Sequence, residues 1–381
     1  MSPVVKAASA AEFLSLVPVM LGFHPRRSLV MIPFEGSRSL GAMRFDLPQD
    51  DLDSAAATIL GLVCRVQEAD AVAVVVYTDD PLGEGMPHAE LVDELTRRAD
   101  ACGVRLSDAL CVGPDAWGSY VDPQSPTGGR PLDDIPLPPL EVGDLDVDGD
   151  QASGAVLPAV GAGECSDLAR ALVSLDDAVR VLCGPEAGDA HAPDDDDEER
   201  RIDPQALAAA CALDDLPALF EDALAWDAAH PTPFDAATLV WCLSRPSLRD
   251  IALTQWCRGF SAGDEALDAQ LRWEEGEEYP VHLAMQLWGE GDRPDVARLE
   301  AALVLVRRLA AAAPQESRPG PLAVAAWISW ALGRSTHAEA YASAAREIDP
   351  DHGLSEIVLS FVTTGHLPDW AFARPRRAQV T

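Results

Sequence analysis

The stretch from Pro319 to His352 constrains the fold more than any other part of the chain. It reads as an apolar helix, a turn at Gly333, an Ala-rich second helix and a stop at Asp349-Pro350. Ala338 and Ala345 fall where a tetratricopeptide repeat needs small residues, although the usual Trp and Tyr of that repeat are absent. Such repeats bury a face against neighbours and bind partners. This stretch therefore predicts a helical region with a scaffold or interaction role.

The helical pattern extends over residues 202–375. Apolar residues recur at i, i+3 and i+4 within 216–224, 248–252 and 296–309, which predicts an all-α domain, either a bundle or a short solenoid, ending in the helix pair 319–350. Its tryptophans are expected mostly in the core. Trp273 differs because glutamates surround it, which makes it a candidate for an exposed partner-binding position. These glutamates are Glu274, Glu275, Glu277 and Glu278.

The N-terminal part alternates between helix and strand patterns. A capping box at 9–12 opens a helix to Leu21. Further helices are predicted at 51–66, 86–102 and 166–182, a hairpin at 28–34 and 39–47, and strands at 71–78 and 104–112. The run 71–78 is continuously apolar, as in strands that are buried on both faces. We therefore expect an α/β domain over residues 1–190 with a mixed, partly parallel sheet and at least three parallel strands.

Acidic segments mark the predicted boundary. The run from Pro193 to Glu199 predicts a solvated linker over 191–201, between the α/β domain and the helical domain 202–375. A second acidic run, 144–150, resembles the first half of a calcium loop, but Ala155 stands where the bidentate Glu belongs, which favours a linker. Residues 113–139 are rich in Pro, Gly and Asp and predict a loop over one sheet edge.

Charge and cysteine usage limit the partners. With 63 acidic and 28 basic residues the net charge is −35, which repels phosphate backbones and argues against direct nucleic-acid binding. The eight cysteines show no C-x-x-C pair and no metal-finger spacing, so we expect reduced, mostly buried thiols in a cytoplasmic protein. No segment reaches the ~18 apolar residues of a membrane span. No membrane association, metal or cofactor is predicted.

Polar residues follow both predicted parallel strands. Asp79 and Asp80 come directly after 71–78, and Asp115 and Trp117 follow 104–112. Ligands of open α/β sheets bind outside the carboxyl ends of such strands, so these residues are expected to line one crevice, with Trp117 to Tyr120 as a lid. If the carboxylates of Asp79 and Asp115 are close, each raises the proton affinity of the other and favours a cation or a polyol between them.

His24 is a further candidate, at the junction of a helix and a strand beside Arg26 and Arg27, where a capping or packing role fits as well. The chain contains no G-x-S-x-G, H-E-x-x-H or P-loop motif. The leading hypothesis is therefore a non-enzymatic scaffold that binds a protein partner through its helical domain. The alternatives are a small-molecule-binding or cation-binding protein or enzyme using the strand-end crevice, and an acidic nucleic-acid mimic.

Three segments together carry a family resemblance: LVPVMLGFHPRRSLVMI (16–32), ALCVGPDAWGSYVDP (109–123) and the helix pair 319–350. In order and spacing they resemble domain-of-unknown-function family 4192 (DUF4192) of high-GC Gram-positive bacteria, which implies no established activity. In that family the W-x-S-Y segment is often followed by cysteines. Residues 121–129 contain none, so the resemblance implies no metal or disulfide role for this loop.

Overall fold

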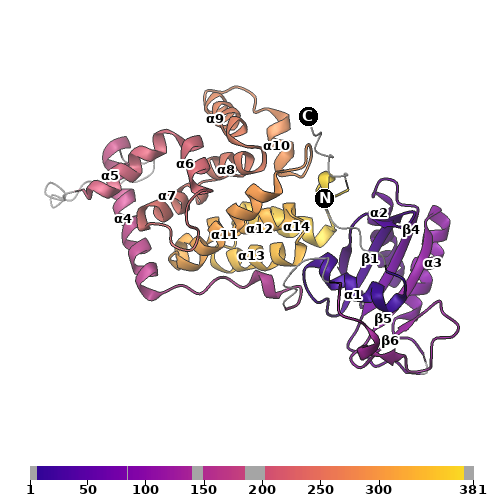
Figure 1. Ribbon diagram of the computed structural model, residues 1–381. Coiled ribbons are helices and arrows are strands. Elements are labelled where there is room, and N and C mark those ends of the chain that lie inside the picture. Colours follow the sequence, from indigo (N-terminus) through magenta and orange to yellow (C-terminus); the bar gives the residue numbers. More distant parts are fainter. Residues whose placement is uncertain (1–6, 84, 140–148, 185–201, 373–381) are drawn as a thin grey trace. The chain divides into compact units, whose positions relative to one another are not determined.

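The β-branched run at 71–77 forms a central strand of a mixed sheet (Figure 1). The computed structural model describes residues 7–83, 85–139, 149–184 and 202–372. Within them the sheet has seven strands in the order β2-β1-β4-β5-β6-β7, with β3 also paired to β1. The strands are β1 (Ser28–Glu35), β2 (Arg38–Ser39), β3 (Met43–Asp46), β4 (Ala71–Tyr77), β5 (Arg105–Val112), β6 (Ala116–Ser119) and β7 (Arg130–Pro131).

Strand directions confirm a mixed, partly parallel sheet. β4 and β5 are parallel, whereas β1 is antiparallel to both β3 and β4. β3, β4 and β5 thus run the same way, but β4 and β5 are the only parallel neighbours among the described strands, because β1 lies between β3 and β4. The predicted loop at 113–139 instead begins with a tight turn. The N–H of Gly113 donates to the carbonyl of Ala116 at 2.9 Å, and the chain returns as β6, antiparallel to β5.

Helices cover both faces of the sheet. α1 (Ala10–Leu21) packs on the face that presents Val30 and Val75, whereas α2 (Leu52–Cys64) and α3 (Ala89–Cys102) pack on the face that presents Met31 and Val74. Alternation along each strand places successive side chains on opposite faces, so both faces of β4 are buried. The predicted cap of α1 is confirmed, since the Ser9 hydroxyl accepts from the N–H of Glu12 at 3.2 Å.

From Ala155 onward the chain forms a second, helical unit. Leu168 and Leu175 of its first long helix, α4 (Ala162–Cys183), are buried in the core of this unit. The two compact units therefore divide between Gly154 and Ala155, N-terminal to the predicted boundary near residue 190. The predicted linker 191–201 and most of the acidic run 144–150 lie outside the described residues. The helices are α4 (Ala162–Cys183), α5 (Pro204–Cys211), α6 (Leu216–Ala223), α7 (Pro233–Leu243), α8 (Pro246–Arg258), α9 (Phe260–Glu274), α10 (Val281–Leu287), α11 (Val296–Ala312), α12 (Pro319–Ala331), α13 (Ser335–Ile348) and α14 (Gly353–Thr364).

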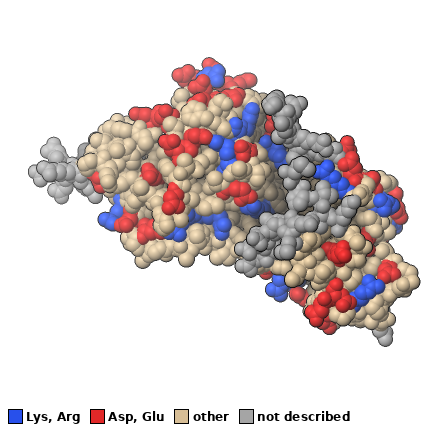
Figure 2. All heavy atoms as spheres, viewed as in Figure 1, with Lys and Arg blue, Asp and Glu red and all other residues tan. Residues whose placement is uncertain are grey.

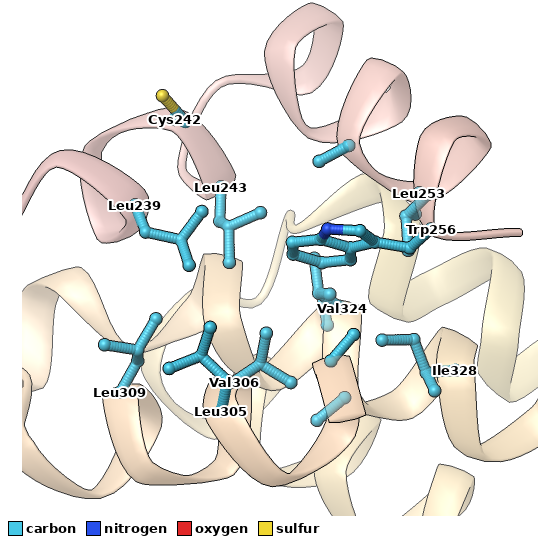
Figure 3. Packing of buried hydrophobic residues seen from close by; sticks show 14 of the residues in the cluster. Leu239, Cys242, Leu243, Leu253, Trp256, Leu305, Val306, Leu309, Val324 and Ile328 are labelled. Carbon is cyan, nitrogen blue, oxygen red and sulfur yellow. The ribbon is translucent and has the colours of Figure 1, made fainter. Parts of the chain in front are cut away.

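The core of the helical unit is built around α12, every residue of which is buried. Figure 3 shows Val324 and Ile328 of this helix beside Trp256 of α8 and Val306 of α11. The buried indoles also satisfy their N–H groups, as when Trp256 Nε1 donates to the Phe220 carbonyl at 3.0 Å. Of the helices in the described ranges, none combines the length and apolar character needed to cross a bilayer.

The helix pair predicted at 319–350 is formed by α12 and α13. Ala338 and Ala345 are fully buried, as expected for small residues in a helix contact. Gly333, however, is not at a tight contact, because a Cβ added there would meet no atom within 4 Å. Its φ of +81° explains the glycine instead, since this left-handed conformation ends α12.

Candidate functional site

The ends of four strands meet at one edge of the N-terminal sheet. Ser28, the first residue of β1, lies opposite Asp46 at the end of β3 and opposite Tyr77 at the end of β4. Tyr77 in turn lies opposite Val112, the last residue of β5. The connections that carry His24, Asp79, Asp80 and Asp115 therefore all leave the sheet at this edge.

Two adjoining hollows lie at this edge, with volumes of about 580 Å³ and about 780 Å³. Both are lined by Arg27, Leu47, Gln49 and Asp79, and we call the two together the strand-edge groove. Each hollow also has polar lining residues of its own. In the smaller hollow these are Arg26, Asp46, Asp150 and Gln151. In the larger hollow they come from the end of β4 and the start of α3, and are Thr78, Asp80, His88 and Glu90.

Backbone contacts hold the basic side of the groove. The side-chain amide of Gln151 pairs with the backbone of Arg26, accepting from its N–H at 3.1 Å and donating to its carbonyl at 2.9 Å. Arg27 has a φ of +46°, a left-handed conformation that is unusual for a residue with a side chain. Its carbonyl accepts from the N–H of Leu47 at 3.3 Å, which fixes the connection before β1 to the end of β3.

A small polar network forms the other side. The Thr78 hydroxyl accepts from the N–H of Asp80 at 3.1 Å and lies 3.2 Å from Nε2 of His88. That nitrogen is 3.7 Å from a carboxylate oxygen of Asp80. His88 has a φ of +56° and directly precedes α3. The groove wall thus presents a hydroxyl, a carboxylate and an imidazole that are oriented by one another.

The electrostatic balance of the groove is mixed. The N–H of Ala152 and the hydroxyl of Ser153 hold the pKa of Asp150 below its usual range, so this carboxylate stays negative at neutral pH. Asp46 pairs with Arg44. Among the described residues, neither the guanidinium of Arg27 nor the carboxylate of Asp79 has a protein partner. Arg27 and Asp79 therefore offer a positive and a negative group to a ligand from positions that line both hollows.

The predicted site residues separate into two sets. Asp79 and Asp80 line the groove, whereas His24, Asp115, Trp117 and Tyr120 are not among its lining residues. His24 and Asp115 are exposed at the same edge. Sequence reasoning did not assign Gln49, Thr78 or His88 to the site. The missing information was the position of β1 beside β4, which brings the segment before β1 and the end of β3 to the carboxyl end of β4.

Trp117 and Tyr120 have structural surroundings. Trp117 is 2% exposed, packs in the core on the α1 side of the sheet and lies under the guanidinium of Arg130, 5.2 Å from the ring centre. The hydroxyl of Tyr120 donates to the Pro87 carbonyl at 2.6 Å, and burial raises the pKa of this phenol. Trp117 to Ser119 belong to β6, so this segment is not the predicted lid loop. Tyr120 instead anchors the connection that leads to His88.

Among the described residues, no three His, Cys, Asp or Glu side chains are gathered closely enough to hold a metal ion. Arg27, Asp79, Gln49 and the Thr78 network offer hydrogen bonding and charge pairing in the groove.

The helical unit carries a second candidate surface at the end of α9. Trp273 is 53% exposed. The four glutamates around Trp273 are also exposed, and Figure 2 shows acidic side chains gathered over α9 at the top of the view. We call Trp273 and these glutamates the acidic-aromatic surface.

Comparison with known proteins identifies the family. No curated protein and no solved structure matches the chain. Residues 11–369 match the model of the family described as Domain of unknown function (DUF4192). Since this match covers nearly the whole chain, the protein belongs to the DUF4192 family.

Proposed function

We propose that the N-terminal unit binds a small zwitterionic ligand in the strand-edge groove. One observation carries this proposal. Arg27 and Asp79 both line the two hollows, and neither of their charged groups has a partner among the described residues. A guanidinium recognises a carboxylate or phosphate, and a carboxylate recognises an amine. A ligand that carries both groups satisfies both side chains at once.

Neighbouring groups favour a ligand with further polar atoms. Gln49 and Gln151 offer amide donors and acceptors, and Thr78 offers a hydroxyl. Because the groove is open to solvent, single charge contacts are screened, and affinity depends on several contacts made together. An amino acid or a related amine-bearing acid of similar size fits this requirement. The proposal extends the strand-end hypothesis. Arg27 replaces Asp115 as the second ligand-binding residue beside Asp79.

Ligand-dependent melting tests this function. Free amino acids, simple amines and simple carboxylates would be screened by thermal shift against the parent and against Asp79→Asn and Arg27→Gln. We expect an amino acid to raise the melting temperature of the parent and to lose this effect in both variants.

Matched controls come from the opposite end of the same unit. Asp100→Asn and Arg105→Gln remove the same charges from exposed positions at the end of α3 and the start of β5. Both controls should keep the shift of the parent. A shift that survives in Asp79→Asn and Arg27→Gln, or no shift with any zwitterion, would rule out this use of the groove.

The acidic-aromatic surface supports a second function, binding of a basic protein segment by the helical unit. An exposed indole among four carboxylates suits an Arg or Lys side chain, which can stack on the ring and pair with a glutamate. The interpretation of α12 and α13 as a tetratricopeptide-like pair, and a cytoplasmic location, belong to this proposal.

An arginine-rich peptide tests the acidic-aromatic surface. It should bind the parent, and Trp273→Ala should weaken binding roughly tenfold in calorimetry. Val304→Ala, at an exposed position of α11, is the control that should bind as the parent does.

A further inference from the structure

Two cysteines that are far apart in the sequence are brought together at the edge of the sheet opposite the strand-edge groove. α2 follows β3 and precedes β4, and α3 connects the parallel strands β4 and β5. Both helices pack on the same face of the sheet and run back from the groove side (Figure 1). Cys64 is the last residue of α2, and Cys102 is the last residue of α3.

The two thiols are neighbours and are accessible. Cys64 and Cys102 end two helices that pack on one another, Cys102 contributes to the raised pKa of the Cys64 thiol, and both residues are exposed. Cys111, Cys242 and Cys257 are buried instead, and the expectation of mostly buried thiols is wrong because Cys183 and Cys211 are exposed too. No C-x-x-C motif marks this pair, since the packing of α2 on α3 brings the two residues together.

We propose that Cys64 and Cys102 form a reversible redox pair that is oxidised to an intramolecular disulfide by low-molecular-weight disulfides. In the first step, a thiolate of the pair attacks one sulfur of the small disulfide, which forms a mixed disulfide and releases one small thiol. The second thiolate then attacks the protein sulfur of the mixed disulfide, which forms the Cys64–Cys102 bond and releases the second small thiol. The pair loses two electrons and two protons, and the small disulfide gains both.

The surroundings of the pair set its pH dependence. Partial burial, together with the neighbouring Cys102, raises the pKa of the Cys64 thiol. Because the thiolate is the attacking species, the exchange becomes faster as the pH rises. The product would tie the C-terminal ends of α2 and α3 together and thereby restrain the helix layer on this face of the sheet.

The test uses the full chain incubated with glutathione disulfide, alkylated, and digested with trypsin without reduction. Cleavage after Arg44, Arg65, Arg98 and Arg105 releases peptides 45–65 and 99–105, which carry one cysteine of the pair each. We expect these two peptides to be recovered as one disulfide-linked species that dithiothreitol separates. The double variant Cys183→Ser and Cys211→Ser, which removes exposed thiols of the helical unit, should give the same linked species.

Single variants distinguish the steps. In Cys64→Ser the reaction should stop at the mixed disulfide, so peptide 99–105 should carry glutathione. Protein oxidised in denaturant should lose the preference for this one link. The proposal is overturned if the folded parent yields only glutathione adducts on Cys64 and Cys102, or if either cysteine is linked mainly to a different one.

Discussion

Gly320, the second residue of α12, lies against another helix. A Cβ built on it would be 2.6 Å from the carbonyl oxygen of Leu243, at the end of α7. Gly163, the second residue of α4, has no atom within 4 Å of the same added carbon. Since neither glycine has a positive φ, only the available space differs between them.

The same substitution at both positions measures this difference. Gly320→Ala should lower the free energy of unfolding by about 1–3 kcal/mol, because backbone must move to admit the methyl group. Gly163→Ala should change it by less than about 1 kcal/mol, and in the stabilising direction, because alanine favours a helix. Urea unfolding of the two variants checks both values. Equal effects would mean that the close approach of α12 to α7 does not restrict position 320.

Single residues also show what a sequence can predict at this scale. A glycine after an apolar helix predicts a left-handed helix end, and Gly333 adopts this conformation. The environment of Gly320 could not be predicted, because its neighbour Leu243 is distant in the chain. Trp117 was placed in a ligand site by its position after a strand, but the pairing of β6 with β5 turns it into the core.

At the scale of elements, α14 begins with a cap that depends on pH. His352 is its N-cap residue, and Nδ1 lies 3.1 Å from the Ser355 hydroxyl and 3.5 Å from the N–H of Ser355. Burial, and next the nearby guanidinium of Arg249, lower the pKa of His352 below its usual 6.5. Protonation would also remove the lone pair that accepts from Ser355.

A lowered pKa fixes the sign of the effect on stability. The unfolded chain binds the proton more tightly than the folded chain does. The contribution of His352 to the free energy of unfolding is therefore fully present above pH 6.5, and it is lost as the pH falls through the lower pKa of the folded state. His352→Asn keeps an N-cap acceptor without this titration. Between pH ~7.5 and ~5.5 the urea midpoint of the parent should therefore fall more than that of the variant. Parallel pH profiles would show that His352 is not the titrating group.

Elements with strong periodicity were predicted well, as were the antiparallel pairing of β1 with β3 and the parallel pairing of β4 with β5, whereas the pairing of β1 with β4 was not. Residues 71–78 and 104–112 form the parallel pair β4 and β5, because continuous apolar runs separated by a helix leave few alternatives. No local sequence pattern predicts that β1 lies between β3 and β4, because this position depends on which edge of β4 is free to pair. This pairing brings Arg27 into the same groove as Asp79, so the side of the strand-edge groove that carries Arg27 could not be predicted from motifs.

At the scale of the whole molecule, the chain has two separate sets of buried residues. The N-terminal unit buries two clusters on the two faces of its sheet, and the helical unit buries one large cluster around α12. The predicted two-part organisation rested on an acidic run, whereas the division at Gly154 reflects where packing changes. Because α4 follows this division and buries its apolar face among helices, its periodicity alone could not assign it to either unit.

Separate cores predict separate unfolding transitions. Leu95→Ala removes a buried side chain from α3 in the N-terminal unit, and Ile328→Ala removes one from α12 in the helical unit. Each should destabilise its own unit by about 2–5 kcal/mol, through lost burial and the cavity left behind. In calorimetry of the full chain, Leu95→Ala should lower the midpoint of one transition by several degrees, and Ile328→Ala that of the other. If both substitutions lower a single shared transition, the two units unfold as one cooperative structure, and an amino acid bound in the strand-edge groove would then protect the helical unit as well.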